Sequence, residues 1–108
     1  MNVLKRIVSR FTARGRSLAL VSQGRICAVN GDTANAIKHY TKVIDSPESP
    51  RDVVAMALLN RALVFSRVGE EQRATSDLNV ILGMPQSIPV IKKSARDKLV
   101  RMKRKNKV

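Results

Sequence analysis

The chain has 108 residues and a mass of 12.0 kDa, which suffices for one small hydrophobic core and argues against two independent domains. Lysine and arginine number 21 against eight acidic residues, so the formal net charge is +13 and acidic partners are favoured. A single cysteine and a single histidine exclude a disulfide framework and a zinc site built from cysteine and histidine ligands.

The positive charge is concentrated at the two ends of the chain. Residues 1–31 carry six basic groups and no acidic group, residues 32–91 carry six basic and seven acidic groups, and residues 92–108 carry nine basic groups and one acidic group. No apolar run approaches the roughly 20 residues of a membrane-spanning helix, so we expect a soluble protein of the cytoplasm. An acid-free, arginine-rich start is also typical of an organelle transit peptide, which leaves organelle targeting open as an alternative.

The first expected element is a helix over residues 2–13. Apolar residues recur along one of its faces at helical spacing, and basic residues occupy the other face. This apolar stripe consists of Val3, Leu4, Ile7, Val8 and Phe11. Three roles for the stripe stay open: a cap packed on the rest of the domain, a transit peptide, or a helix lying on a membrane surface.

An internal repeat follows this helix. Four pairs of identical residues share one offset along the sequence: Leu20 and Leu58, Gly31 and Gly69, Ala36 and Ala74, Pro47 and Pro85. Each copy reads as two helices joined at the shared glycine, since glycine readily adopts the left-handed conformation that closes a helix. The expected helices cover residues 17–30, 33–45, 51–68, 71–82 and 89–104.

The second copy resembles the tetratricopeptide repeat, a helix-pair family in which large, small and aromatic residues follow a fixed spacing. The residues that carry the resemblance are Leu58, Ala62, Phe65, Gly69, Ala74, Leu78, Ile81 and Pro85. The first copy matches with Leu20, Gly24, Cys27, Gly31, Ala36, Tyr40, Val43 and Pro47, although Cys27 stands where the family usually has an aromatic residue. The offset between the copies exceeds the family's repeat of about 34 residues, and the surplus fits a proline-rich linker over residues 46–52.

The resemblance implies an all-α solenoid of about six helices. Its parts would be a basic amphipathic N-terminal helix (1–16), two repeats (17–50 and 51–88), a capping helix (89–104) and a basic tail (105–108). In the expected alignment, Ala95, Leu99 and Met102 of the capping helix correspond to Leu58, Ala62 and Phe65, so they face the stack while the cations face water. Two helix pairs bury little surface, so the end helices either close the stack of a monomer or pair in a dimer.

The resemblance also implies a scaffold that binds a protein partner, with the first helix of each pair lining a concave groove. The residues expected in that groove are Arg25, Asn60, Leu63, Lys93 and Arg96. Cations bind carboxylates and aliphatic side chains supply apolar burial, so the expected partner is an acidic or amphipathic peptide. The competing interpretation is that Asn60 and Arg61 are solvated helix residues and that Leu59 and Leu63 pack beneath the N-terminal helix.

A second class of partner is nucleic acid, bound through the basic C-terminal helix. The candidate phosphate ligands are Lys98, Arg101, Lys103, Arg104 and Lys105. Their charge suffices for a salt-dependent attraction to phosphates. Recognition of single strands also needs stacking platforms, and the three aromatic residues of the chain all occupy helix-packing positions.

The sequence contains no set of residues typical of a catalytic site. His39 is expected on the solvated side of the helix over 33–45, and Cys27 at a buried position where a thiol is unreactive. There is no glycine-rich phosphate loop in the sequence. We therefore expect a binding module that is not an enzyme and that needs neither a cofactor nor a metal.

Overall fold

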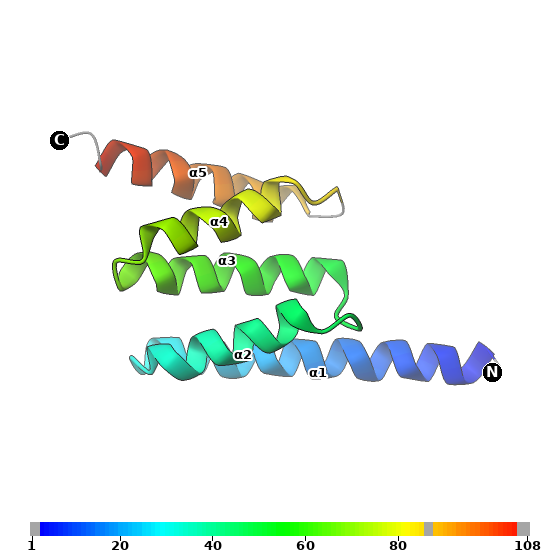
Figure 1. Ribbon diagram of the computed structural model, residues 1–108. Coiled ribbons are helices and arrows are strands. Elements are labelled where there is room, and N and C mark those ends of the chain that lie inside the picture. Colours follow the sequence, from blue (N-terminus) through cyan, green and yellow to red (C-terminus); the bar gives the residue numbers. More distant parts are fainter. Residues whose placement is uncertain (1–2, 86–87, 106–108) are drawn as a thin grey trace.

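The computed structural model describes residues 3–85 and 88–105, and this part of the chain is helical throughout apart from its turns (Figure 1). The helices are α1 (Val3–Val29), α2 (Thr33–Asp45), α3 (Arg51–Arg67), α4 (Glu71–Leu82) and α5 (Pro89–Lys105). Consecutive helices are antiparallel and pack on one another, and α3 also contacts α1 and α5. Helices α1, α3 and α5 therefore form one layer, and α2 and α4 lie on one side of it. The expected all-α class is confirmed.

Helix α1 is continuous over 27 residues. The expected break between helices over residues 2–13 and 17–30 is therefore wrong, and the described residues form five helices where about six were expected. Gly15 lies within the expected break, but a single glycine costs a helix only about 1 kcal/mol relative to alanine. Contacts made by the neighbouring residues outweigh that cost.

These contacts join the middle of α1 to the linker between the two helix pairs and to the first turn of α3. The linker does not extend freely from the surface, because its polar side chains bind α1. The three contacts are Arg14 with Asp52 at 2.9 Å, Arg16 with Glu48 at 3.0 Å, and Ser17 with Ser49 at 3.2 Å. The helical conformation around Gly15 is thus stabilised by a segment that lies far along the sequence, beyond the whole of α2.

Both glycine turns have the expected geometry. Gly31 and Gly69 have φ angles of 80° and 84°, in the left-handed region that favours glycine. In each turn, the glycine N–H and the following N–H donate back to the preceding helix, which is the Schellman arrangement. The four bonds are Gly31 to Ala28 (3.2 Å), Asp32 to Cys27 (2.8 Å), Gly69 to Ser66 (3.2 Å) and Glu70 to Phe65 (2.8 Å). The two turns are copies of each other, related by the offset of the sequence repeat.

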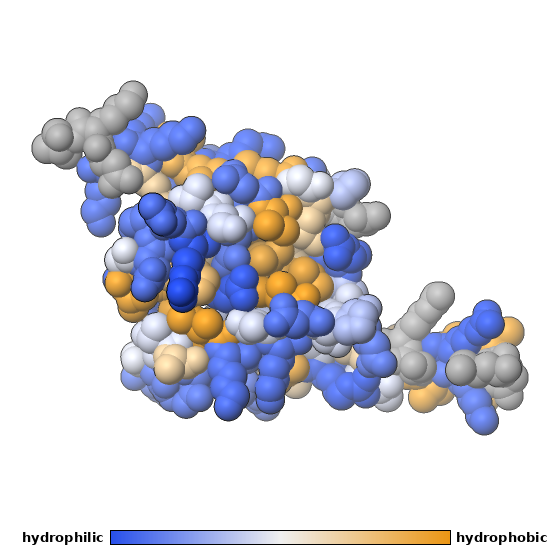
Figure 2. All heavy atoms as spheres, viewed as in Figure 1, coloured by the Kyte–Doolittle hydropathy of each residue, from blue (hydrophilic) through white to orange (hydrophobic). Residues whose placement is uncertain are grey.

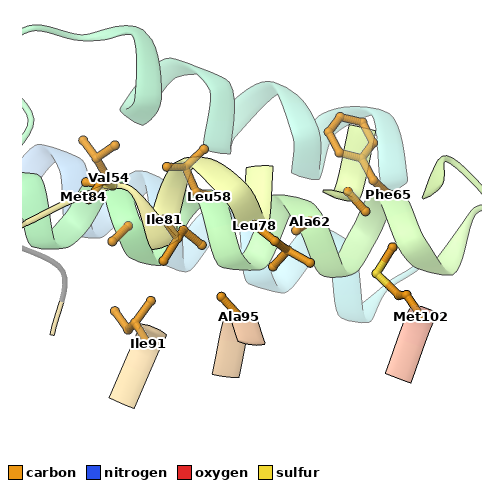
Figure 3. Close-up of a cluster of buried hydrophobic side chains, with 12 residues drawn as sticks. Val54, Leu58, Ala62, Phe65, Leu78, Ile81, Met84, Ile91, Ala95 and Met102 are labelled. Atoms are coloured by element: carbon orange, nitrogen blue, oxygen red, sulfur yellow. The ribbon is translucent and has the colours of Figure 1, made fainter. Parts of the chain in front are cut away.

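Helix α3 is buried on two sides because it lies between two apolar clusters. The cluster between α1, α2 and α3 contains Val21, Ala36, Tyr40, Val43, Val53, Ala57 and Val64. The cluster between α3, α4 and α5, most of which Figure 3 shows, includes Val54, Leu58, Ala62, Phe65, Leu78, Ile81, Met84, Ile91, Ala95 and Met102. Since both clusters draw on α3, this helix lacks the single apolar stripe of a surface helix.

The N-terminal part of α1 extends beyond the rest of the molecule (Figure 1). Its apolar stripe, from Val3 to Phe11, is exposed, with residues between 45% and 71% accessible. The expectation that this stripe caps the first helix pair is therefore wrong. The reason is geometric: α2 has only 13 residues and the linker after it meets α1 at Ser17, so the N-terminal turns of α1 project past α2.

No helix in the described part of the chain combines the length and the apolar composition needed to span a bilayer.

Candidate peptide-binding surface

The sides of α1, α3 and α5 that point away from α2 and α4 form one continuous surface, which we call the odd-helix face. Arg61 marks the opposite side of α3, because it hydrogen-bonds Thr41 of α2 and Asp77 of α4. A helix turns by about 100° per residue, so Met56 and Leu63 lie about 140° and 160° from Arg61 on the odd-helix face, and Asn60, about 100° from Arg61, lies at the edge of this face. Leu63 is 39% exposed, and the other two are half-buried.

The packing of α5 determines which of its residues share this face. On α3, the residues that pack on the preceding helix pair are Val53, Ala57 and Val64. On α5, the residues that pack on the preceding pair are Ile91, Ala95 and Met102, which follow those of α3 by the same offset that relates Gly31 to Gly69. The expected alignment of α5, which matched Ala95 to Leu58, is therefore wrong by one position, because Ala95 corresponds to Ala57. The expectation that α5 turns apolar residues toward the stack is confirmed.

The shared offset also gives equivalent positions on the three helices. The odd-helix face then comprises Leu18, Ser22 and Arg25 on α1, Met56, Asn60 and Leu63 on α3, and Ser94, Lys98 and Arg101 on α5. Arg25 and Arg101 are exposed, and Lys98 is half-buried. Aliphatic side chains on α3 thus lie between cations on α1 and on α5.

Of the five expected groove residues, Arg25, Asn60 and Leu63 come together on this face, and Lys93 and Arg96 do not. Lys93 lies on the side of α5 opposite its buried residues, where its Nζ is 2.8 Å from Oδ2 of Asp97. The hydrogen bond from Lys93 holds the pKa of Asp97 below its usual value. Arg96 is exposed and lies about 140° around α5 from Arg101, in the direction of the C-terminal end of the stack.

Two details of α3 bear on the competing interpretation of the groove. Asn60 is not simply solvated, because its Nδ2 donates to the carbonyl of Met56 at 2.8 Å. Leu63 does not pack beneath the first turns of α1, because its side chain remains exposed. The face therefore offers an apolar side chain at its centre.

The candidate phosphate ligands lie toward the end of α5. Arg101, Lys103, Arg104 and Lys105 are exposed, whereas Lys98 is half-buried. Helical spacing places Lys98, Arg101 and Lys105 on one side of α5, the side that belongs to the odd-helix face, whereas Lys103 and Arg104 lie on other sides of the helix. The phosphate candidates therefore overlap the proposed peptide-binding surface in part.

The tightest polar cluster of the described residues was not expected from the sequence. Arg61 donates two parallel hydrogen bonds to the carboxylate of Asp77, at 2.8 and 2.7 Å, and a third to Oγ1 of Thr41 at 3.0 Å. Only 18% of the Arg61 side chain and 7% of the Asp77 side chain are exposed, so the expectation of a solvated Arg61 is wrong. The Asp77 carboxylate raises the pKa of Arg61 above its usual value. Its guanidinium also lies 5.6 Å from the ring centre of Phe65.

This ion pair joins α2, α3 and α4, and we interpret it as structural. A signal for it exists in the sequence, because Arg61 and Asp77 are equally distant from Gly69, one before it and one after it. Residues equidistant from the turn of an antiparallel helix hairpin lie at the same level along the two helices, and those on the facing sides come into contact. The same rule pairs Gln23 with His39 around Gly31.

The two residues weighed for catalysis are both half-buried. His39 was expected to be solvated, but its ring is half-buried and its Nδ1 is shielded from solvent. Cys27 borders the cluster between α1, α2 and α3. Within residues 3–85 and 88–105, no three histidine, cysteine or acidic side chains are grouped in a way that could hold a metal ion.

Comparison of the chain with protein-family models, with curated proteins and with solved structures finds no match. The resemblance to tetratricopeptide repeats therefore depends on the residues, spacing and turns of this chain alone.

Proposed function

We propose that the chain is a non-catalytic, tetratricopeptide-like module that binds an acidic, amphipathic peptide on the odd-helix face. The observation that carries the proposal is the exposed Leu63 on the central helix, with exposed Arg25 on the helix to one side and exposed Arg101 on the helix to the other. An apolar anchor between two cations suits a peptide that presents an aliphatic side chain flanked by carboxylates.

The charge around this face supports the choice of an acidic partner. Residues 1–31 contain no acidic side chain, and α5 contains only Asp97, which pairs with Lys93. Charges of one sign on both outer helices attract an oppositely charged partner and accelerate its association. A basic peptide would meet repulsion on both sides of Leu63.

The test uses a fluorescently labelled synthetic peptide of alternating leucine and glutamate and measures its binding by anisotropy. Reversing Arg25→Glu and Arg101→Glu together is expected to weaken binding by about tenfold or more, which corresponds to about 1.4 kcal/mol. The matched control is Lys38→Glu with Lys42→Glu, which makes the same charge change at exposed positions on α2. Binding by the control should fall much less, and only through the general loss of positive charge.

A second comparison separates the two possible locations on α5. Arg25→Glu with Arg96→Glu carries the same charge but alters the position expected from the sequence. It should retain more binding than the variant that carries Arg101→Glu. If all three double variants bind the peptide equally, the odd-helix face is not the binding site.

The alternative function is binding of nucleic-acid phosphates, which the exposed cations in the last turns of α5 favour. Replacing Lys103, Arg104 and Lys105 by glutamine should then weaken binding to a single-stranded RNA and reduce its salt dependence. Unchanged RNA binding would discard this alternative without affecting the peptide proposal.

A further inference from the structure

The first three turns of α1 expose apolar side chains that no other part of the described chain covers. Val3 is 71% exposed, Leu4 67%, Ile7 45%, Val8 53% and Phe11 71%. Figure 2 shows this segment projecting at the lower right, with apolar and polar atoms side by side. Isolated apolar residues are normal on a protein surface, but a helix segment with five of them is an interaction surface.

Helical periodicity places these apolar residues on one side of α1 and Lys5 and Arg6 on the other. The stripe continues along the helix through Leu18, Ile26 and Val29, which are also exposed. Ala13, Ser17 and Gly24, which packs against Tyr40, face the core and lie roughly opposite the stripe, and the buried Val21 lies between the two sides. The stripe therefore points away from α2 and the core, so that a flat surface can contact the projecting segment of α1.

The charge of the projecting segment indicates which kind of partner surface its apolar stripe contacts. No acidic residue occurs before Asp32, whereas Lys5 and Arg6 lie within the projecting segment. A second copy of the chain would bring the same acid-free segment and a net charge of +13, so pairing of two α1 helices is opposed by repulsion. An anionic bilayer complements both features, because its acyl region accepts apolar side chains and its headgroups attract cations.

We propose that α1 lies in the interface of an anionic membrane, with Leu4, Val8 and Phe11 inserted below the headgroups and with the basic side chains at the level of the phosphates. Helices α2 and α4 lie on the side of α1 that faces away from the lipid. The stripe lies on the same side of α1 as Leu18 and Arg25 of the odd-helix face, but the inserted residues Leu4, Val8 and Phe11 lie in the projecting segment, so their variants test membrane insertion separately from peptide binding.

The first experiment measures insertion with a single tryptophan, which the chain otherwise lacks. Phe11→Trp in the full chain should show a blue-shifted emission when vesicles of phosphatidylcholine and phosphatidylserine are added, because the indole moves into an apolar environment. Val80→Trp is the matched control, since Val80 is exposed on α4, in the other layer of the molecule. No shift is expected for the control or for vesicles of phosphatidylcholine alone. An unshifted Phe11→Trp spectrum would overturn the proposal.

The second experiment measures binding by co-sedimentation with the same vesicles. Leu4→Gln with Phe11→Gln should weaken binding by about tenfold or more, whereas Val68→Gln with Val80→Gln, which are also exposed but lie on other parts of the chain, should leave it unchanged. If the first double variant binds as well as the parent, the attraction is electrostatic only and the insertion claim is wrong. If the parent shows no vesicle binding but light scattering shows a dimer that Leu4→Gln with Phe11→Gln dissociates, the stripe is covered by a second copy and the membrane proposal is wrong.

Discussion

Single glycines determine where the chain reverses direction. Gly31 and Gly69 have the only positive φ angles among the described residues, and each closes a helix with the same pair of backbone hydrogen bonds. A residue with a Cβ is strained at these positions because φ is positive. A position with a negative φ angle accepts a residue with a Cβ without that strain. Gly83, which ends α4 with a φ angle of −85°, is a glycine of the second kind.

This difference gives a prediction for paired substitutions. Gly69→Ala should lower the free energy of unfolding by about 1–2 kcal/mol, because alanine is strained in the left-handed conformation. Gly83→Ala should change it little, since a Cβ there would be 3.6 Å from its nearest neighbour, an ordinary contact distance. Urea unfolding followed by circular dichroism measures both values. Equal losses in the two variants would contradict the assignment of Gly69 to a strained turn.

At the scale of elements, α1 combines two glycines with opposite roles. A Cβ on Gly24 would lie 2.5 Å from Cε1 of the buried Tyr40, so the missing side chain lets α1 and α2 approach each other closely. A Cβ on Gly15 would have no neighbour within 4 Å. The same helix therefore contains one glycine that its packing requires and one that it does not.

Substitution by alanine should consequently act in opposite directions at the two sites. Gly15→Ala should raise the free energy of unfolding by roughly 0.5–1 kcal/mol, because alanine favours the helix and meets no obstacle. Gly24→Ala should lower it by about 1–3 kcal/mol, since Tyr40 must move. Thermal unfolding monitors both changes, and the helical signal at low temperature reports whether Gly24→Ala still folds. Stabilisation by Gly24→Ala would show that the Tyr40 ring relaxes without cost.

At the scale of the whole molecule, ion pairs compensate part of a large positive charge. Arg14 binds Asp52 through two hydrogen bonds, at 3.0 and 2.9 Å, and holds the pKa of that carboxyl below its usual value. Lys93 has the same effect on the pKa of Asp97. A carboxyl whose pKa is lower in the folded chain binds more protons when the chain unfolds, so acid favours unfolding.

Stability is therefore expected to decrease as the pH falls. The contribution of Asp52 is fully present above its unfolded pKa of about 3.9 and is lost as the pH falls through the lower folded value. Protonation of carboxylates also increases the net charge beyond +13, which adds repulsion. Arg14→Gln should weaken the dependence of the unfolding free energy on pH below about 4, whereas Arg51→Gln, which removes the same charge beside Asp52, should not. Identical pH profiles for the two variants would refute a specific role of Arg14.

The sequence by itself determined the features that depend on neighbouring residues. The expected bounds of α2 and α4 agree with the structure, and those of α3 and α5 differ by one residue at the C-terminal end, because glycine and proline act locally on the backbone that they belong to. The positions of both turns follow for the same reason.

Only the tertiary structure decided what depends on contacts between distant segments. The contacts of α1 with the linker and with the start of α3 support its continuity, and the position of Arg101 rather than Arg96 on the odd-helix face comes from the packing of α5 on α3 and α4. The burial of Arg61 comes from an aspartate on the next helix and a threonine on the previous one. Side chains that lie far apart along the chain meet only after the helices have packed, so their contacts leave little trace in the local pattern of the sequence.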